Sequence, residues 1–268
     1  MDSPESLQGR VAVVTGVGRR RGIGFAIARA LAERGASLLV QHWRPHDEQQ
    51  PWGADDPATV VGELASSLRG DARVVDMSLD LGDERAPAAL VEYGVAEFGH
   101  VDVLVCNHAV SGSDGPLDAV DAAELDLHWR VNTRATLLAT RAFARQHDGR
   151  EGGRVVWMTS GQQLGPMPDE IAYATSKAAL AGITQSVAAD LAERAILLNT
   201  VNPGPVNTGF LDPEHIDPGL REGLLAAFPQ ERFGEPVDVA RLVAWLVSDE
   251  GRWIVGQVLN SEGGLRRG

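Results

Sequence analysis

A short apolar run, a glycine-rich turn and a helical pattern follow one another near the start of the chain, and this succession constrains the fold more than any other feature. Residues 10–14 are a β-branched run that ends just before Gly16. Helical periodicity occupies residues 25–34 and stops at Gly35, and the apolar residues 37–40 follow. The segment therefore predicts a strand, a turn, a helix and a second strand, which is the βαβ unit of a parallel sheet.

The same alternation continues through the chain. Further strands are expected at residues 72–77, 101–105, 154–158, 196–201 and 257–260, and further helices at about residues 58–68, 85–98, 122–146, 173–194 and 237–247. The chain has 268 residues without an internal repeat or a linker-like change of composition, which suits a single domain spanning residues 1–268. We therefore expect an α/β fold, a doubly wound and mostly parallel sheet with helices on both faces.

Two segments stand outside this alternation. Residues 41–57 form a polar loop with two tryptophans, longer than most connections between a strand and a helix. A lid, a cofactor clamp and a subunit contact are all open roles for this loop. Residues 206–229 are irregular with helical patches, and we expect them to form a substrate lid.

Composition excludes several classes of function. The formal net charge of −13 argues against binding to nucleic acid or to anionic membrane surfaces. No apolar run reaches the ~18 residues that a membrane span needs, and the first ten residues lack the features of a signal peptide, so we expect a cytoplasmic protein. The single cysteine, Cys106, rules out an internal disulfide, and we expect no metal site.

The glycine-rich turn indicates a dinucleotide cofactor. Glycines let a backbone approach a diphosphate, and the following helix offers free N–H groups and a partial positive charge. We assign cofactor contacts in this turn to Gly16, Gly18, Arg19, Arg20, Arg21, Gly22, Ile23 and Gly24.

The residues after the second strand favour NADP over NAD. A site specific for NAD usually presents a carboxylate to the ribose about 20 residues beyond the glycines. Here that stretch reads Gln41, His42, Trp43 and Arg44, with no acid before Asp47. Arg44 and the arginines of the turn could pair with a 2′-phosphate, and we add His42, Trp43 and Arg44 to the predicted contacts. The alternative is that the arginines form a solvated rim and that the cofactor is NAD.

Tyr173 and Lys177 are the strongest candidates for chemistry. They are four residues apart at the expected start of a helix, which places both side chains on one face. Lys177 is the only lysine among 24 basic residues, and we expect its ammonium to lower the pKa of the phenol toward neutrality. Ser160 follows the run 154–158, at the sheet edge where ligands bind. The alternative is an ordinary pair of residues on a helix surface.

In chain order, these motifs resemble those of the short-chain dehydrogenase/reductase family over nearly the full length. The matching elements are TGVGRRRGIG, CNHA, Asn132, Ser160, Tyr173, Lys177 and NPGPVNT. The resemblance implies a Rossmann-like sheet of about seven strands and an Asn-Ser-Tyr-Lys tetrad. In that scheme Tyr173 protonates the carbonyl oxygen, Ser160 orients it, Lys177 lowers the tyrosine pKa and holds the nicotinamide ribose, and Asn132 fixes a water that links Lys177 to solvent.

Further cofactor contacts are implied by the resemblance alone. They are Asp80 and Leu81 at adenine, Asn107, His108 and Ala109 near the adenosine ribose, Pro203, Gly204, Val206 and Thr208 around the carboxamide, and Tyr173 with Lys177 at the nicotinamide ribose. Two departures from the family pattern stand out. The turn between Gly16 and Gly22 is enlarged, as in enoyl reductases, although those enzymes space tyrosine and lysine more widely. His108 replaces a usual alanine and either lines the substrate pocket or packs at the strand end.

The resemblance narrows the reaction but leaves the substrate open. It favours an NADP-dependent oxidoreductase that interconverts a ketone and a secondary alcohol, and our first choice of substrate is a 3-oxoacyl thioester. An NAD-dependent alcohol or sugar dehydrogenase, a non-catalytic NADP-binding regulator, and a dehydratase or epimerase are the alternatives. The pocket is expected to involve Ser111, Gln162, Gln163, Leu164, Met167 and the lid, and the family implies a homo-oligomer, a tetramer or a dimer.

Overall fold

The computed structural model describes residues 6–112 and 114–267. Seven strands form one sheet in the order β3-β2-β1-β4-β5-β6-β7, and every neighbouring pair is parallel. The strands are β1 Val11–Val14, β2 Ser37–His42, β3 Val74–Ser78, β4 Val103–Cys106, β5 Gly153–Met158, β6 Ile196–Asn202 and β7 Val258–Asn260. The α/β class and the parallel sheet that the sequence predicts are therefore confirmed.

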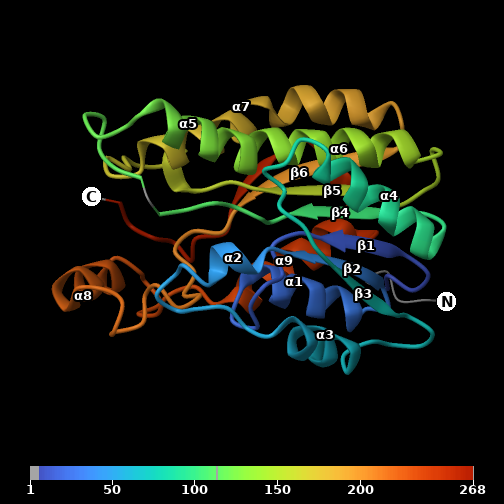
Figure 1. The fold of residues 1–268 in the computed structure, drawn as a ribbon, viewed down its shortest axis with the longest axis horizontal. Helices are drawn as coiled ribbons and strands as arrows, with labels where there is room; N and C mark the ends of the chain where they lie inside the picture. The colour runs from blue at the N-terminus through green and yellow to red at the C-terminus, as the bar shows by residue number, and fades with distance from the viewer. Residues whose placement is uncertain (1–5, 113, 268) are drawn as a thin grey trace.

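Helices cover both faces of this sheet (Figure 1). In chain order they are α1 Ile23–Ala32, α2 Arg44–Asp47, α3 Pro57–Ala65, α4 Ala86–Phe98, α5 Ala122–His128, α6 Ala135–Gln146, α7 Ile171–Ala192, α8 Pro218–Ala226 and α9 Pro236–Val247. One layer contains α4, α5, α6 and α7, and the other contains α1, α3 and α9. Among the described residues, no helix combines the length and the hydropathy needed to cross a membrane.

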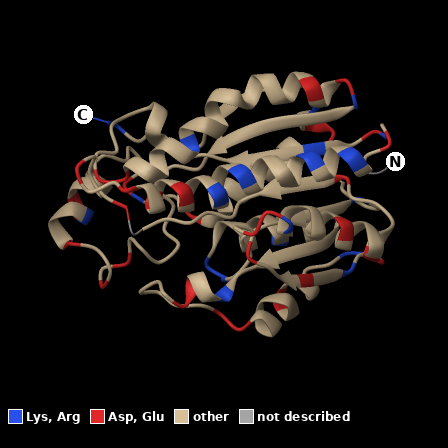
Figure 2. Ribbon diagram, turned by 45° about the horizontal axis from the view of Figure 1, so that its top comes forward, with Lys and Arg blue, Asp and Glu red and all other residues tan. Residues whose placement is uncertain are grey.

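Successive side chains of the central strands enter two different cores. In β1, Ala12 and Val14 belong to the core beneath α1 and α9, whereas Val11 and Val13 belong to the core beneath α4, α6 and α7. This follows from the two-residue period of a strand, since a sheet covered on both faces needs apolar residues at every position. Charged residues accordingly concentrate on helices and loops (Figure 2).

The order of the strands places a crevice at the carboxyl ends of β1 and β4. The chain leaves β1 toward β2 on one side, and β4 begins the other half of the sheet on its other side. Ligands of open parallel sheets bind at such a switch point. The glycine-rich turn follows β1, and Ser160 follows β5 at the same edge.

The two segments outside the alternation contain more regular structure than the sequence predicts. The loop at 41–57 begins inside β2, which continues to His42, and contains the short helix α2. The segment 206–229, predicted to be a lid and called the lid below, contains α8. The long helix expected at 122–146 is interrupted by a π-helical segment, Trp129–Arg134, and periodicity alone does not reveal such an interruption.

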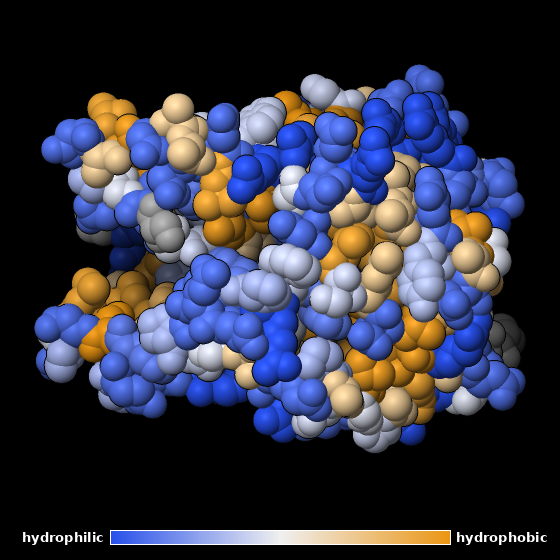
Figure 3. All heavy atoms as spheres, in the orientation of Figure 1, coloured by the Kyte–Doolittle hydropathy of each residue, from blue (hydrophilic) through white to orange (hydrophobic). Residues whose placement is uncertain are grey.

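Figure 3 shows a hollow between α8 and the loop that precedes α5. Large apolar side chains are exposed in the segments around it. They are Leu117 in the loop before α5, Leu164 after β5, Phe210 in the lid and Leu220 in α8. Exposed apolar side chains on these segments suit contact with a ligand that has apolar parts.

Candidate active site

The structure brings Ser160, Tyr173 and Lys177 together beyond β5. The first turn of α7 carries Tyr173, and the Lys177 Nζ atom lies 5.7 Å from the centroid of the tyrosine ring. The Ser160 side chain is hydrogen-bonded to that of Tyr173. Lys177 is buried, and its Nζ donates to the carbonyl oxygen of Met158, the last residue of β5, at 3.0 Å. A buried ammonium thus lies behind the ring whose hydroxyl meets the serine.

The expected acidification of the phenol is not found. Burial raises the pKa of Tyr173 to about 12, the hydrogen bond from Ser160 lowers it, and the nearby Glu170 carboxylate raises it further. Burial also lowers the pKa of Lys177 to about 8, against an opposing effect of Cys106. Desolvation is therefore the dominant cause of both shifts, and Lys177 is not among the groups that shift the pKa of Tyr173. The hydroxyl carries its proton at neutral pH, which is the state that a proton donor requires.

Asn132 lies near this group but bonds to other partners. It is fully buried in the π-helical segment, where its side-chain oxygen accepts from the Val110 N–H at 2.8 Å. Its amide nitrogen donates to the Val110 carbonyl oxygen at 3.1 Å and to the Ser176 hydroxyl at 3.0 Å. The side chain thus joins the loop after β4 to α7, at the residue directly before Lys177.

Asp114 is a site residue that the sequence did not reveal. Its carboxylate accepts N–H groups from Tyr173 at 2.6 Å, Ala172 at 3.1 Å and Gly115 at 2.8 Å. Burial opposes ionisation, but these three hydrogen bonds hold the pKa of the carboxyl below its usual value. Asp114 therefore caps the amino end of the helix that carries the tyrosine. The usual signal of a cap is a polar residue just before the helix, whereas this one comes from 58 residues away in the sequence.

The glycine-rich turn can accept a diphosphate. At Gly16, with φ of +71°, a Cβ atom would lie 2.9 Å from the Asn107 amide nitrogen and from the His108 Cα atom, so a larger residue does not fit. Helix α1 follows, and its N-cap residue Gly22 provides no side-chain cap. The free N–H groups at this end of a ten-residue helix suit a phosphate.

The arginines of the turn are engaged by other protein groups. Arg20 pairs with Asp55 at 3.3 Å and with Glu63 at 2.8 Å, and Arg21 pairs with Asp212 at 2.8 Å. Asp47, the acid excluded on sequence spacing, lies at the turn after all. One of its carboxylate oxygens is 3.9 Å from the Arg19 Nε atom, and the other lies against Gly18.

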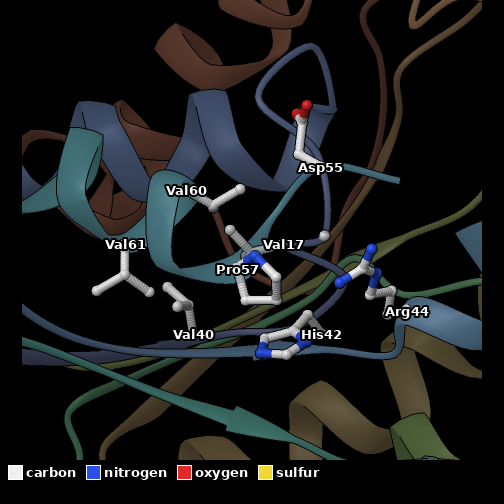
Figure 4. A pocket seen from close by; sticks show the side chains of 9 residues that line it. Val17, Val40, His42, Arg44, Asp55, Pro57, Val60 and Val61 are labelled. Carbon is white, nitrogen blue, oxygen red and sulfur yellow. The ribbon is translucent and has the colours of Figure 1, made fainter. Parts of the chain in front are cut away.

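A pocket beyond β2 holds two of the residues predicted to choose the cofactor (Figure 4). His42 and Arg44 lie along one side of it, and its apolar wall contains Val17, Val40, Pro57, Val60 and Val61. His42 is buried and its Nε2 atom lies 3.1 Å from an oxygen of Asp76. Arg44 is half exposed and pairs with Glu48 at 2.7 Å. Trp43 does not line this pocket and is 39% exposed.

His108 is a packing residue, which decides between the two roles left open by the sequence. Its ring nitrogens lie 2.7 Å from the Thr15 hydroxyl and 3.0 Å from the Val131 carbonyl oxygen. Because a carbonyl only accepts, the neutral ring donates from Nε2 and accepts at Nδ1. Burial, with a smaller effect of Lys177, lowers the pKa of His108 to about 3. Both ring nitrogens of His108 are thus engaged by protein groups, and its contact with the cofactor stays a prediction.

The side chain of Asn107 also serves the turn itself. Its amide nitrogen donates to the carbonyl oxygens of Thr15 at 3.1 Å and Gly16 at 3.2 Å. Among the other predicted contacts, Asp80 accepts from the Gly82 N–H at 2.8 Å, while Leu81 and Val206 are buried. Asn107 thus bonds to the backbone of the glycine-rich turn, and Asp80 bonds to the backbone of the loop that follows β3.

Two further predicted residues, Gly204 and Gln162, follow β6 and β5. Gly204 adopts φ of +66° after β6, and its N–H donates to the Asn202 side chain at 3.0 Å. Gln162 donates to the Thr159 hydroxyl at 3.1 Å, and its buried side-chain oxygen has no partner among the described residues. Within the described ranges, no group of three or more His, Cys, Asp or Glu residues could hold a metal ion.

Comparison with known proteins identifies close relatives along the whole chain. Residues 16–266 match the family model described as Enoyl-(Acyl carrier protein) reductase. The protein named "Uncharacterized oxidoreductase YjdA" of Bacillus subtilis is 37% identical over 263 residues, which cover 97% of this chain and 98% of that protein. The "Hydroxynaphthalene reductase-like protein Arp2" of Metarhizium acridum is 35% identical over 279 residues, with 97% and 96% covered.

Solved structures agree with these relatives. A short chain dehydrogenase from Burkholderia cenocepacia in complex with NADP is 34% identical, with a TM-score of 0.82 over 96% of this chain and 98% of that one. A 7α-hydroxysteroid dehydrogenase complexed with NADH and 7-oxoglycochenodeoxycholic acid is 28% identical, with a TM-score of 0.86 over 99% and 97%.

Proposed function

The chain belongs to the short-chain dehydrogenase/reductase family of NAD(P)-dependent oxidoreductases, and from this premise we propose that it reduces a ketone to a secondary alcohol with NADPH. The observation that carries the proposal is the contact of Ser160 with a protonated Tyr173 whose ring lies beside the buried Lys177. These are the groups that a carbonyl oxygen needs when it gains a proton.

Each residue has a defined part in the proposed reaction. A nicotinamide cofactor would supply the hydride when bound. Tyr173 gives its hydroxyl proton to the carbonyl oxygen as negative charge develops there, and Ser160 orients that oxygen by a hydrogen bond. The Lys177 ammonium lies beside the tyrosine ring, where its charge favours the phenolate that remains, and it would also hold the nicotinamide ribose. Asn132 and Asp114 fix the segments on which these side chains lie.

The choice of NADPH rests on the pocket after β2. His42 and Arg44 line this pocket together with Asp55, which is paired with Arg20, and β2 itself ends without the carboxylate that would bind the ribose hydroxyls of NAD. One observation favours NADH as the second candidate. Asp47 lies against Gly18, so a carboxylate that could repel a 2′-phosphate is present at the turn. Relative efficiency with the two cofactors decides between them.

For the substrate we propose a 3-oxoacyl thioester, because the exposed apolar side chains around the hollow suit an acyl chain. A polycyclic ketone is the second candidate. It is favoured by the relative named for hydroxynaphthalene reduction and by a promiscuous reductase, LugOII, that catalyses keto-reduction during lugdunomycin biosynthesis and is 32% identical to this chain.

The test is a screen of both ketone classes and of the corresponding alcohols, followed by the absorbance of the reduced nicotinamide with each cofactor. Turnover of either class supports a reductase, and the class that is reduced faster identifies the class of substrate. Binding of cofactor without turnover of any ketone or alcohol would overturn the proposal in favour of a regulator. Tight retention of the oxidised cofactor through many cycles would indicate an epimerase or dehydratase.

We also propose a homo-oligomer, a tetramer or a dimer, that assembles through the face of α5. Leu125 is 39% exposed and Trp129, which follows α5, is 48% exposed, so an apolar surface is available there. Size-exclusion chromatography with light scattering tests the assembly. Trp129→Ala should shift the protein toward smaller species, and a parent protein that is monomeric at micromolar concentration would contradict it.

A further inference from the structure

The enlarged glycine-rich turn fastens both irregular segments of the chain. Arg20 donates from its backbone N–H to Asp55 at 2.7 Å, so the end of the 41–57 loop is held by main-chain and side-chain bonds together. Arg21 makes two hydrogen bonds to the Asp212 carboxylate in the lid, at 2.8 and 2.9 Å. Arg19 reaches the lid too, because its Nη1 atom donates to the Thr208 carbonyl oxygen at 2.8 Å.

Trp52 lies where the turn, the loop and the lid meet. The Arg19 guanidinium carbon is 5.4 Å from the centroid of its ring. The ring centroid lies 6.4 Å from that of Phe210 and 6.1 Å from that of His215, both in the lid. At Gly209, with φ of +123°, a Cβ atom would come within 3.0 Å of the Trp52 Cβ atom. One side chain of the 41–57 loop therefore packs against three residues of the lid.

Arg19 differs from its two neighbours in its surroundings. Its side chain is only 14% exposed, whereas those of Arg20 and Arg21 are 45% and 62% exposed. Its ion pair with Asp47 is long, at 3.9 Å, and burial raises the pKa of that carboxyl while lowering the pKa of Arg19 itself. A buried guanidinium with a distant counter-charge is poorly compensated. An anion bound at the turn would provide the nearby negative charge that the Arg19 guanidinium lacks.

We propose that Arg19 and Trp52 are positioning residues that couple occupancy of the diphosphate site to the placement of the substrate lid. The inference rests on the proposed binding of a nicotinamide dinucleotide. The Arg19 carbonyl oxygen accepts the N–H of Gly22, the N-cap of α1, so this residue belongs to the turn that would hold the diphosphate. A phosphate there stabilises the guanidinium in the position from which it holds Thr208 and stacks on Trp52. Cofactor binding then fixes residues 206–229 over the substrate.

The 41–57 loop thereby acquires a role among the three that its sequence left open. It acts as a clamp, because Trp52 transmits the position of Arg19 to Phe210 and His215. Trp52 is the better residue to change, since it contacts the lid and the arginine without belonging to the phosphate-binding turn. Substitution of Trp52 therefore tests the coupling between the diphosphate site and the lid separately from the affinity for the cofactor.

Hydrogen–deuterium exchange of residues 206–229, with and without NADPH, tests the coupling in the full-length protein. In the parent, saturating NADPH should slow exchange of this segment by about tenfold, within the usual range of coupling between two sites. In Trp52→Ala the slowing should disappear while the dissociation constant for NADPH changes by less than about threefold. The ketone KM should rise by about tenfold with little change in kcat.

Two further variants distinguish loss of the Trp52 contact from a general loosening of the loop. Trp52→Phe retains an aromatic ring and should restore most of the protection, which a variant that merely loosens the loop would not do. Trp253→Ala is the matched control, because that tryptophan is 92% exposed in the turn Glu250–Trp253. Equal protection by NADPH in the parent and in Trp52→Ala would overturn the inference and leave the proposed function intact. Failure of the parent to bind either cofactor would instead overturn the proposed function.

Discussion

The two ends of the crevice are built in different ways. At the catalytic end, side chains are buried and bonded to the backbone, as Lys177 is to Met158 and Asn132 is to Val110. At the cofactor end, exposed arginines bond to carboxylates of distant loops, as Arg21 does to Asp212. Buried hydrogen bonds fix one arrangement, whereas exposed ion pairs contribute little and exchange readily. The proposed catalytic residues are thus held by buried hydrogen bonds, whereas exposed ion pairs hold the segments around the proposed cofactor site.

The largest effect that would test this contrast is the pH dependence at the catalytic end. Lys177 has a pKa of about 8, so its ammonium is present below that pH and is lost above it, whereas Tyr173 with a pKa of about 12 stays protonated throughout. The kcat/KM for ketone reduction should therefore fall above pH 8 by up to about tenfold per pH unit. Lys177→Arg keeps a cation over this range. Its kcat/KM should therefore not fall above pH 8, whatever its absolute rate. The same fall of kcat/KM above pH 8 in both proteins would assign that fall to another titrating group.

Removal of the cap on the catalytic helix should have the next largest effect. Asp114→Ala deletes the acceptor for the Tyr173 and Ala172 N–H groups, so the tyrosine loses its fixed position and kcat should fall by about tenfold. Asp114→Asn keeps one acceptor oxygen and should recover most of this loss. Asp56→Ala removes the cap of α3 and is the control, because a similar loss of about 1 kcal/mol in stability should leave kcat unchanged. Equal kcat for the parent and Asp114→Ala would remove Asp114 from the site.

At the cofactor end, charge reversal should alter preference more than rate. Arg44→Glu places a carboxylate in the pocket after β2, which repels a 2′-phosphate and can accept from ribose hydroxyls. The ratio of kcat/KM with NADPH to that with NADH should fall by roughly fivefold, as expected for a half-exposed charge. An unchanged ratio would exclude Arg44 from cofactor choice and would favour Asp47 as the residue that sets it.

Removal of the exposed ion pair between the glycine-rich turn and the lid should have the smallest effect on stability and on the ketone KM. Arg21→Ala removes two hydrogen bonds to Asp212, but the arginine is 62% exposed, so the free energy of unfolding should fall by less than about 1 kcal/mol. The ketone KM should rise by no more than about twofold, measured beside Trp52→Ala. A larger rise in KM for Arg21→Ala than for Trp52→Ala would reverse the ranking of the two lid contacts.

The sequence predicts most of the fold because both of its signals are local. Continuous apolar runs locate the strands to within two residues, and glycines such as Gly16 and Gly35 mark the turns between them. The strand ends then place Ser160 and the glycine-rich turn at one edge of the sheet. The spacing of Tyr173 and Lys177 by four residues predicts a shared helix face, which the structure has.

The parts that the sequence could not predict depend on contacts between distant segments. Asp114 caps a helix 58 residues away, and Asp47 returns to Gly18 although it lies beyond the usual position for an acid. The pKa of Tyr173 also differs from the expectation, because sequence spacing shows the neighbouring cation but not the burial that raises the pKa of the phenol. The partners of Arg19, Arg20 and Arg21 follow from the path of two long loops, which periodicity does not reveal.

The most direct test of the central claim is single-turnover reduction of a ketone by NADPH in the parent and in Tyr173→Phe, at equal cofactor occupancy. Phenylalanine preserves the ring beside Lys177 but removes the proton that the carbonyl oxygen receives. We predict a rate lower by roughly 10²- to 10⁴-fold with an unchanged dissociation constant for NADPH. A rate equal to that of the parent would contradict the assignment of Tyr173 as the proton donor.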